Sequence, residues 1–481
     1  MPTCRPAWAR PSTSGRDDRR AGLAATRPAR VGDGPGGRGG GPVRVAERLS
    51  ERDRRIAALA VPALATVAVE PLYTLVDTGI VGRLGTAPLG GLALAAVVLN
   101  ASFWVFNFLS FGTTSRVAFL TGAGDDRAAA EVASQGLWLC ACIGIPVGLL
   151  LFGAAHPVAA LLGGHAGILR AATTYLRISA AGMPFILVSL VGNGYLRGLS
   201  DTRTPLRVVL VANIVNVVLE LLLVYVAHLG IAGSAWGTVV AQVLAAAWFA
   251  LLIARRVAAT GAGLRPLPGE MRRLVVVGRH LFVRTGALLT TLTLATSVAA
   301  RVGPSTLGAH QIALQVWLFL TLAFDALAIP AQALTGTMLG AGEVAEARAY
   351  SARLLRLGIF FGFLVAGVLA ASSPVLPDAF TADPRVASRA TAALVVVGIL
   401  QVPGAVLWVL DGVLMGASDF RFLQVGTISA LLAFVPVGAA VLVWRRLGIV
   451  GIWLGLSLWL LVRLTINHRR YAGTRWTEVT A

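Results

Sequence analysis

The sequence predicts an all-α polytopic membrane protein, with twelve transmembrane helices in two six-helix lobes related by a parallel internal repeat. Three observations predict this fold. The 481 residues are 56% hydrophobic and only 13% charged, whereas soluble domains have about 25% charged residues. Apolar windows long enough to cross a bilayer recur along most of the chain. The chain also aligns with itself, without gaps, at the offset of 218 residues that separates Arg83 from Arg301.

Residues 1–54 are expected to be a disordered tail. They are rich in Arg, Gly and Pro, and include a GDGPGGRGGGP run that cannot bury a core. The tail also lacks the apolar core of a cleaved signal peptide. Its arginines are expected to hold it on the cytoplasmic side of the membrane.

Apolar windows after the tail predict the membrane spans. The first six spans make a lobe over 55–255, a basic linker follows at 256–273, the last six make a second lobe over 274–468, and 469–481 form a second cytoplasmic tail. The expected spans are 56–82, 88–118, 129–154, 170–196, 204–227, 231–254, 274–300, 306–338, 347–371, 387–414, 421–443 and 449–467.

The arginines set the expected orientation. The net charge of +19 does not indicate nucleic-acid binding, because the basic residues lie in the tail and in short loops, where they act as topological anchors. Arginine is more frequent in the loops that share a side with the N-terminus. Both termini are therefore expected in the cytoplasm, around a multi-pass protein of the cytoplasmic membrane.

Matching glycine-containing segments define the repeat. Because each lobe holds an even number of spans, both lobes enter the membrane in the same sense, and such parallel repeats place a substrate between the halves. A transporter that rocks one half against the other needs this arrangement, and a passive channel does not. The matches include Arg83-Leu84-Gly85 with Arg301-Val302-Gly303, Gly122-Ala123-Gly124 with Gly340-Ala341-Gly342, Gly198 to Arg203 with Gly416 to Arg421, and Gly230 to Gly233 with Gly448 to Gly451.

Asp77 lies in an apolar helix of membrane-spanning length, and Glu70 and Tyr73 share its helical face. An intramembrane carboxylate costs roughly 2.5–3.5 kcal/mol on insertion scales and suggests function. The alternative is a polar group satisfied by a neighbouring helix. Pro62 and Pro71 in the same span permit a kink, which would couple protonation to cavity shape; the alternative is that a membrane helix simply tolerates both prolines.

The fifth span carries a second carboxylate, Glu220. It lies on the same helical face as Asn213 and Asn216. We expect Asp77, Asn216 and Glu220 to make a hydrated proton or cation site, in which a protonated carboxyl loses its hold on a cationic substrate. For the asparagines alone, interhelical hydrogen bonding is the alternative.

Polar residues in further spans are expected to line a substrate cavity. Trp317 and Trp408 are candidates to stack against a planar cation, and Asp325 and Asp411 have the alternative of a helix cap or an ion-pair partner. The expected lining is Glu70, Tyr73, Asn100, Asn107, Asn213, Gln311, Gln315, Asp325, Trp408 and Asp411.

The sequence predicts no cofactor, no metal site and no enzyme. Its three cysteines make no disulfide framework, and its six histidines have no ligand spacing. A membrane-embedded enzyme would need clustered His, Asp or Ser groups at a membrane face.

Several motifs together resemble the multidrug and toxic compound extrusion (MATE) transporters, particularly the DinF-type branch, over about residues 55–468. They are PLYTLVDTGIVGRLG, GNGYLRGLSDTRTP, NxxxE in the fifth span, LGAHQIALQ and LDGVLMGASDFR. The resemblance implies two six-helix lobes, a V-shaped central cleft, and proton- or sodium-driven efflux of organic cations or other amphipaths.

The resemblance also implies residue roles. By motif, Asp77 matches the first-helix coupling aspartate, Asn216 the fifth-helix asparagine and Glu220 its partner acid, although the family more often has Asp there. Asp325 and Asp411 match second-lobe acids. The seventh span carries no acid, unlike that of the sodium-coupled branch, which favours protons.

The expected function is a secondary antiporter that exports small organic, cationic or amphipathic compounds in exchange for protons. Its expected partners are the substrate, the proton (with sodium as the alternative) and membrane lipid; it is expected to be a monomer. The alternative function is a lipid-linked saccharide flippase of the same superfamily. Such flippases tend to have cationic cavities, whereas the intramembrane charges here look mainly acidic.

Overall fold

The structure is a computed structural model that describes residues 42–478, with side chains from Glu51 onward except that of Glu70. Most of the predicted disordered tail lies outside these residues. The first helix begins at Pro42, so residues 42–54, which were assigned to the tail, are helical. The described residues from Ser50 onward form one compact unit.

The described chain is helical almost throughout, as the hydropathy predicts. Short connections join the helices, and brief turns of other helix types occur at Leu222–Val226, Leu376–Ala379, Arg445–Leu447 and Arg475–Thr477. The α-helices are α1 Pro42–Gly82, α2 Thr86–Phe106, α3 Phe108–Gly122, α4 Asp126–Leu161, α5 Ala166–Ala180, α6 Met183–Gly198, α7 Arg203–Leu221, α8 Ile231–Thr260, α9 Pro268–Val302, α10 Pro304–Gly340, α11 Val344–Ser372, α12 Pro384–Ile399, α13 Gln401–Gly416, α14 Phe420–Val443 and α15 Gly448–Ala472.

Twelve spans result when the bent helix pairs are counted as one span each. Ten helices of the described chain are long and apolar enough to cross a membrane when α2 and α3 are counted as one, Thr86–Gly122, and two further pairs, α5–α6 and α12–α13, pass the same test together. The pairs bend by 54° and 51°, and these bends were not predicted. The twelve-helix fold itself is confirmed.

The internal repeat is visible in the backbone as well as in the sequence. Left-handed φ angles fall at positions that match at the same offset, although serine adopts this conformation at a cost that glycine avoids. The matched pairs are Gly85 with Gly303, Gly124 with Gly342 (78° and 74°), Ser200 with Ser418 (60° and 58°), and Gly230 with Gly448 (57° and 50°). The connections of the two lobes are therefore built alike.

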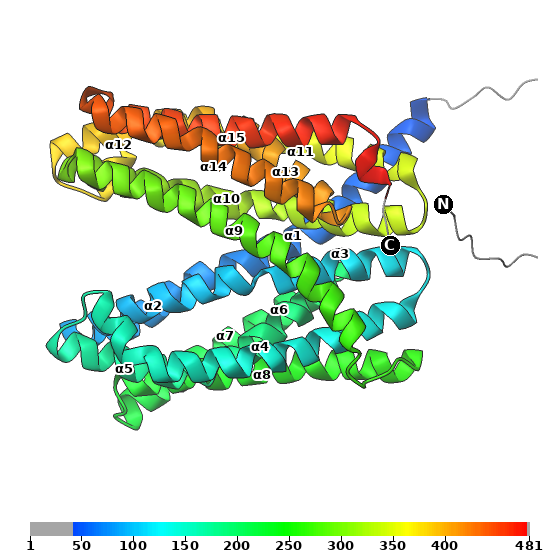
Figure 1. The fold of residues 1–481 in the computed structure, drawn as a ribbon, viewed down its shortest axis with the longest axis horizontal. Helices are drawn as coiled ribbons and strands as arrows, with labels where there is room; N and C mark the ends of the chain where they lie inside the picture. The colour runs from blue at the N-terminus through cyan, green and yellow to red at the C-terminus, as the bar shows by residue number, and fades with distance from the viewer. Residues whose placement is uncertain (1–41, 479–481) are drawn as a thin grey trace, which may run out of the picture. The chain divides into compact units, whose positions relative to one another are not determined.

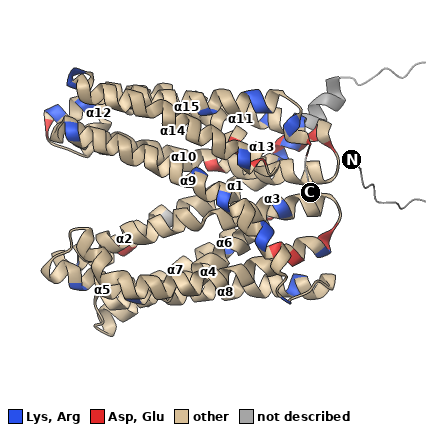
Figure 2. Cartoon of the chain, viewed as in Figure 1, with Lys and Arg blue, Asp and Glu red and all other residues tan. Residues whose placement is uncertain are grey.

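Helices α2–α8 gather in one bundle and α10–α15 in a second (Figure 1). Each bundle has its own apolar core: Leu187, Tyr195 and Phe249 lie in one core of the first, and Trp317 and Trp459 in the core of the second. Charged residues gather toward the end where α3 joins α4 and α10 joins α11, and few lie along the middle of the helices (Figure 2).

The stretch of α1 from Asp53 to Leu59 packs against the second bundle, before the helix reaches the first. Ile56 and Leu59 are buried in a core with Leu354 of α11. Arg353 donates two hydrogen bonds to the Asp53 carboxylate, each 2.6 Å long, which is the bidentate geometry of a strong ion pair. The predicted first lobe, 55–255, therefore does not hold the start of its own first helix.

Helix α9 begins in the converse way, against the first bundle. Met271 and Leu274 pack on the core of that bundle, and Phe108 of α3 lies where a Cβ at Gly278 would be. Because Ile56 and Leu274 are matched positions of the repeat, α1 and α9 are equivalent crossing helices.

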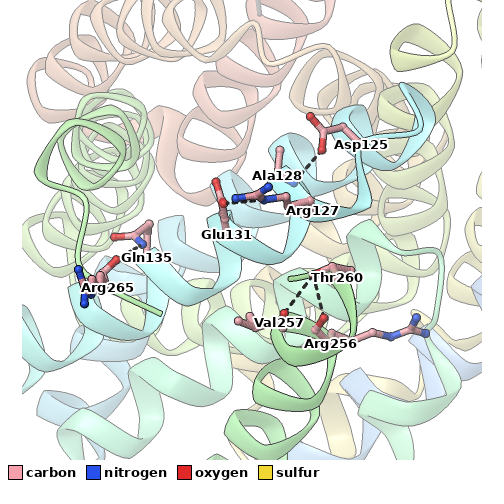
Figure 3. A network of polar contacts seen from close by, with 9 residues as sticks. All are labelled: Asp125, Arg127, Ala128, Glu131, Gln135, Arg256, Val257, Thr260 and Arg265. Atoms are coloured by element: carbon pink, nitrogen blue, oxygen red, sulfur yellow. Dashed lines mark hydrogen bonds and ion pairs between the residues drawn. The ribbon is translucent and has the colours of Figure 1, made fainter. Parts of the chain in front are cut away.

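The connection between the lobes is shorter than predicted and is fixed to α4. Helices α8 and α9 extend into the predicted linker and leave only residues 261–267 between them. The buried Gln135 side chain donates to the Arg265 carbonyl (2.9 Å) and accepts from the Leu267 amide (2.7 Å), and Trp138 donates to the Leu264 carbonyl. Figure 3 shows Gln135 facing Arg265, near the Arg127–Glu131 pair on the same helix.

We expect Gln135→Leu to release this connection. The change removes two hydrogen bonds, and a buried polar group left unpaired costs about 1–3 kcal/mol. Trypsin should then cut faster after the exposed Arg265 in the folded protein. Glu131→Gln, one turn away on α4, should leave the cleavage rate unchanged, and equal rates in the two variants would contradict the assignment.

The two bundles meet where α3 lies against α10. A Cβ at Gly122 would collide with the carbonyl of Thr337, and a Cβ at the matched Gly340 would collide with the carbonyl of Phe119. Glycine is needed here because the backbones touch. Gln332 also crosses this contact and donates to the Phe111 carbonyl at 2.8 Å.

We expect Gly122→Ala to force α3 and α10 apart. Pulsed electron spin resonance between labels on cysteines at Ala123 and Ala341 should report a longer mean distance than in the parent protein, with native cysteines removed from both. Gly367→Ala is the control, since a Cβ there meets nothing within 4 Å. An unchanged distance in Gly122→Ala would contradict close backbone contact.

Candidate ion-coupling and substrate sites

Helix α1 and two helices of the first bundle, α7 and α8, form a buried polar cluster around Asp77. Ser234 of α8 donates a 2.8 Å hydrogen bond to Asp77 Oδ1. Asp77 is 6% exposed and Ser234 is fully buried. The face of α1 that carries Asp77 is thus turned toward α8.

Thr238, one turn further along α8, forms hydrogen bonds with two more side chains of the cluster. Its hydroxyl donates to the Ser234 carbonyl and accepts from Tyr73 (3.1 Å) and Asn216 (3.5 Å). Gly237 lets α7 approach α8, because a Cβ there would lie 3.2 Å from the Glu220 amide nitrogen and 3.3 Å from Asn216 Oδ1. A larger residue would push α7 away.

Glu220 closes the cluster from α7. Its side chain is fully buried and interacts with the carboxyl of Asp77. Neither carboxyl oxygen of Glu220 receives an N–H or O–H donor from the described residues. Helix α7 then passes into a π turn at Leu222–Val226, a feature that is frequent at functional sites, and Tyr225 in this turn donates to the Ile80 carbonyl of α1 at 2.9 Å.

The second bundle holds a buried cluster centred on Asp411 of α13. Arg284 of α9 and Arg463 of α15 each donate a 2.6 Å hydrogen bond to Asp411 Oδ2. Asn467 donates to Oδ1 at 2.7 Å. All four side chains are buried, so this charge network lies inside the bundle.

Half-buried residues lie at the edge of this network. Asp325 of α10 interacts electrostatically with Arg284 and with Arg197, which belongs to α6 of the first bundle. Trp408 packs edge-on against Trp317, with ring centres 6.1 Å apart, and the Arg463 guanidinium lies 5.9 Å from the Trp408 ring centre.

Comparison with known proteins identifies the family. The MatE family model matches residues 62–222 and 286–440. The chain belongs to the MATE family. It is 35% identical over 437 residues to protein DETOXIFICATION 44, chloroplastic, of Arabidopsis thaliana, which covers 87% of this chain and 82% of that protein.

Two further likenesses place this MATE protein in context. It is 27% identical to DNA damage-inducible protein F of Escherichia coli, over 90% of this chain and 95% of that one. The solved outward-facing structure of a multidrug resistance MATE family transporter has the same fold, with a TM-score of 0.80 at 20% identity, over 89% of this chain and 97% of that chain. The protein is a multi-pass membrane transporter of a family that exports drugs and toxic compounds.

The structure brings the predicted ion-coupling residues of this MATE protein together. Asp77, Asn216 and Glu220 meet beside Tyr73, which was assigned to the cavity. Asn213 instead donates to the Val209 carbonyl of its own helix at 2.8 Å. The Glu70 side chain lies outside the described residues.

The remaining predicted cavity residues are dispersed. Asn100 on α2 and Gln311 and Gln315 on α10 are exposed, and Asn107 is half-buried at the break between α2 and α3. Nothing in the described contacts joins these four residues into one site, so their role as cavity lining stays a prediction.

Sequence reasoning missed the α8 side of the first-bundle cluster. Ser234, Gly237 and Thr238 share one helical face at spacings of three and four, which was a readable signal. Tyr175 of α5, buried and interacting electrostatically with Asp77, had no comparable signal.

One expectation about charge was wrong. The sequence predicts mainly acidic intramembrane charges, but Arg284 and Arg463 lie in the predicted spans 274–300 and 449–467 and are buried. An ionisable group inside a membrane span is costly and suggests function whether it is an aspartate, as at Asp77, or an arginine. Asp411 has the ion-pair role that was held as its alternative.

We expect Asp411→Asn to destabilise the protein strongly, because it leaves two buried guanidinium groups without their counter-charge. Breaking such a pair costs about 3–5 kcal/mol. Asp419→Asn, which breaks a 2.6 Å pair with the less buried Arg470, should cost about 1 kcal/mol or less. Denaturant unfolding in detergent measures both, and similar losses would contradict the assigned burial.

Proposed function

We propose that this protein is a secondary antiporter that exports small organic, amphipathic compounds across the cytoplasmic membrane in exchange for protons. Asp77 and Glu220 are the coupling pair, and Asn216 orients them. Both termini lie in the cytoplasm, and the working unit is a monomer. Family membership supports transport, and the concentration of charged residues toward the end where α3 joins α4, although arginines lie at the opposite end too (Figure 2), supports this orientation.

The observation that carries the proposal is the Glu220 carboxyl, buried against Asp77 without a donor. Two neighbouring carboxyl groups that are shielded from water cannot both be ionised unless a cation lies between them. A proton on one of them satisfies the pair, because a protonated carboxyl donates a hydrogen bond to its neighbour. Loss of that proton restores the repulsion. The pair therefore has two states that differ by one proton.

The position of Asp77 on α1 supports coupling between protonation and shape. The start of α1 is fixed to the second bundle by the Asp53–Arg353 pair, whereas Asp77 is bonded to α8 of the first. Pro62 and Pro71 lie between these two attachments, where they remove backbone hydrogen bonds and permit bending. A change at Asp77 thus acts on a helix that both bundles hold.

Dye transport into everted membrane vesicles tests the proposal, because the cytoplasmic face of the membrane is then outside and export is measured as uptake. With an imposed pH gradient, wild-type protein should move a fluorescent amphipathic dye, and Asp77→Asn and Glu220→Gln should each reduce the initial rate at least about tenfold. Glu270→Gln, which breaks a surface pair with Arg273, should keep the wild-type rate. Full activity of Asp77→Asn, or transport driven by a sodium gradient alone, would contradict proton coupling through this pair.

A lipid-linked saccharide flippase remains the second candidate, and one observation favours it. The buried Arg284 and Arg463 are cationic groups of the kind expected in such a flippase. Reconstituted protein that scrambles or flips a fluorescent undecaprenyl-phosphate saccharide, but does not transport the dye, would support this candidate instead.

A further inference from the structure

The charges of the second-bundle cluster do not balance. Among the described residues, three arginines, Arg197, Arg284 and Arg463, interact with two acids, Asp325 and Asp411. The proton-coupling pair of the first bundle does not use this excess positive charge. An uncompensated charge inside a membrane-spanning bundle is energetically costly. A buried charge of this kind therefore indicates a functional site.

Unused hydrogen-bond donors accompany the excess charge. Arg284 is 7% exposed, and its Nε–H meets no acceptor in the part of the chain that the structure describes. The buried Trp459 indole N–H meets none there either. The Arg463 guanidinium lies 4.8 Å from the Trp459 ring centre. Since guanidinium and indole groups only donate, the cluster lacks an acceptor.

The missing acceptor has a definite chemistry. Guanidinium groups match the planar geometry of a carboxylate and the oxygens of a phosphate. Asp411 holds Arg284 and Arg463 side by side through one oxygen, and the Nε–H of Arg284, which meets no acceptor among the described residues, is available to a second oxyanion. The charge count leaves room for one negative charge.

Aromatic side chains beside the cluster fit the rest of such a ligand. Trp408 lies between Trp317 and Phe324, with ring centres 6.1 and 6.4 Å away. Trp408, Asp325 and Arg197 are only half-buried, so they form the accessible edge of the cluster. A flat apolar group can pack against Trp408 while its charged group reaches the arginines.

We propose that the Arg284–Asp411–Arg463 cluster binds the carboxylate or phosphate group of an aromatic, amphipathic compound that the transporter carries. The assignment rests on the proposed function for the transport step and specifies its substrate class. It replaces the cationic substrate expected from the sequence with an anionic one. The first bundle then handles the proton and the second bundle handles the anion.

Equilibrium binding to the purified full-length protein in detergent tests this assignment. The probes are radiolabelled 2-naphthoate, 2-naphthamide and 2-naphthylmethylammonium, which share one ring system and differ in charge. We expect 2-naphthoate to bind at least tenfold more tightly than 2-naphthamide, which corresponds to about 1.4 kcal/mol. Equal affinities, or a preference for the ammonium compound, would overturn the proposal.

A matched pair of variants on α15 locates the effect. Arg463→Gln should reduce the naphthoate preference to less than about twofold and leave 2-naphthamide binding unchanged. Arg470→Gln should keep the full preference, although Arg470 also makes a 2.6 Å pair with an aspartate, Asp419. If Arg463→Gln folds, by its thermal unfolding, and keeps the preference, the proposal is wrong.

A second position covers the case in which Arg463→Gln does not fold. Arg284→Lys keeps the charge of the cluster but loses the planar guanidinium, so it should retain part of the preference, whereas Arg284→Gln should lose it. Wild-type preference in Arg284→Gln would overturn the proposal.

Two further measurements are needed. One distinguishes a lipid headgroup from a transported anion, and the other distinguishes failure of anion binding from failure of proton coupling. Phosphatidylglycerol that binds the wild type but not Arg463→Gln, with no naphthoate preference, would assign the cluster to a lipid headgroup and overturn the substrate assignment. Asp77→Asn should lose proton-driven efflux and keep the naphthoate preference. A wild type that prefers naphthoate but fails to use the pH gradient would overturn the proposed coupling alone.

Discussion

The cost of an unpaired charge away from water governs this molecule. Inside the membrane-spanning part of the protein, an ionised side chain is stabilised by a counter-charge or a hydrogen-bond network. A side chain that has neither indicates a functional site. Asp411 meets the demand in full, with two arginines and an asparagine on its two oxygens. Glu220 does not meet it, because the charged group that interacts with it is another carboxyl, that of Asp77. The contrast between these two acids separates a charge that is fully paired from the one that we propose exchanges a proton.

The fold followed from hydropathy because the bilayer imposes one length and one polarity on every span. The first-bundle site followed from the same constraint, since Asp77 and Glu220 are exceptions in apolar windows. The partners of these exceptions were harder to predict. Nothing in the spacing of Asp411 indicates that Arg284, on a helix far earlier in the chain, supplies its counter-charge. Pairing between helices depends on tertiary packing, which one sequence read alone does not encode locally.

The repeat keeps the backbones of the two halves alike but not their interior polar residues. Matched positions keep the backbone alike, as in the left-handed Ser200 and Ser418, because connections and close helix contacts tolerate few residue types. Interior polar positions are free to differ, and they do. Asp77 matches Ala295 of the second half, whereas Arg284 matches Thr66 of the first. A duplicated scaffold with unlike interiors places a negative cluster and a positive one in the same molecule.

The crossing of α1 has a consequence for how the chain assembles. A membrane protein is made from its N-terminus onward, and domains generally fold as units during synthesis. The first bundle can form once α8 has been made, but Asp53 must wait for Arg353, which is synthesised three hundred residues later. The turn of α1 around Asp53 therefore stays undocked while most of the protein is being inserted. The Asp53–Arg353 pair closes late and joins the finished halves.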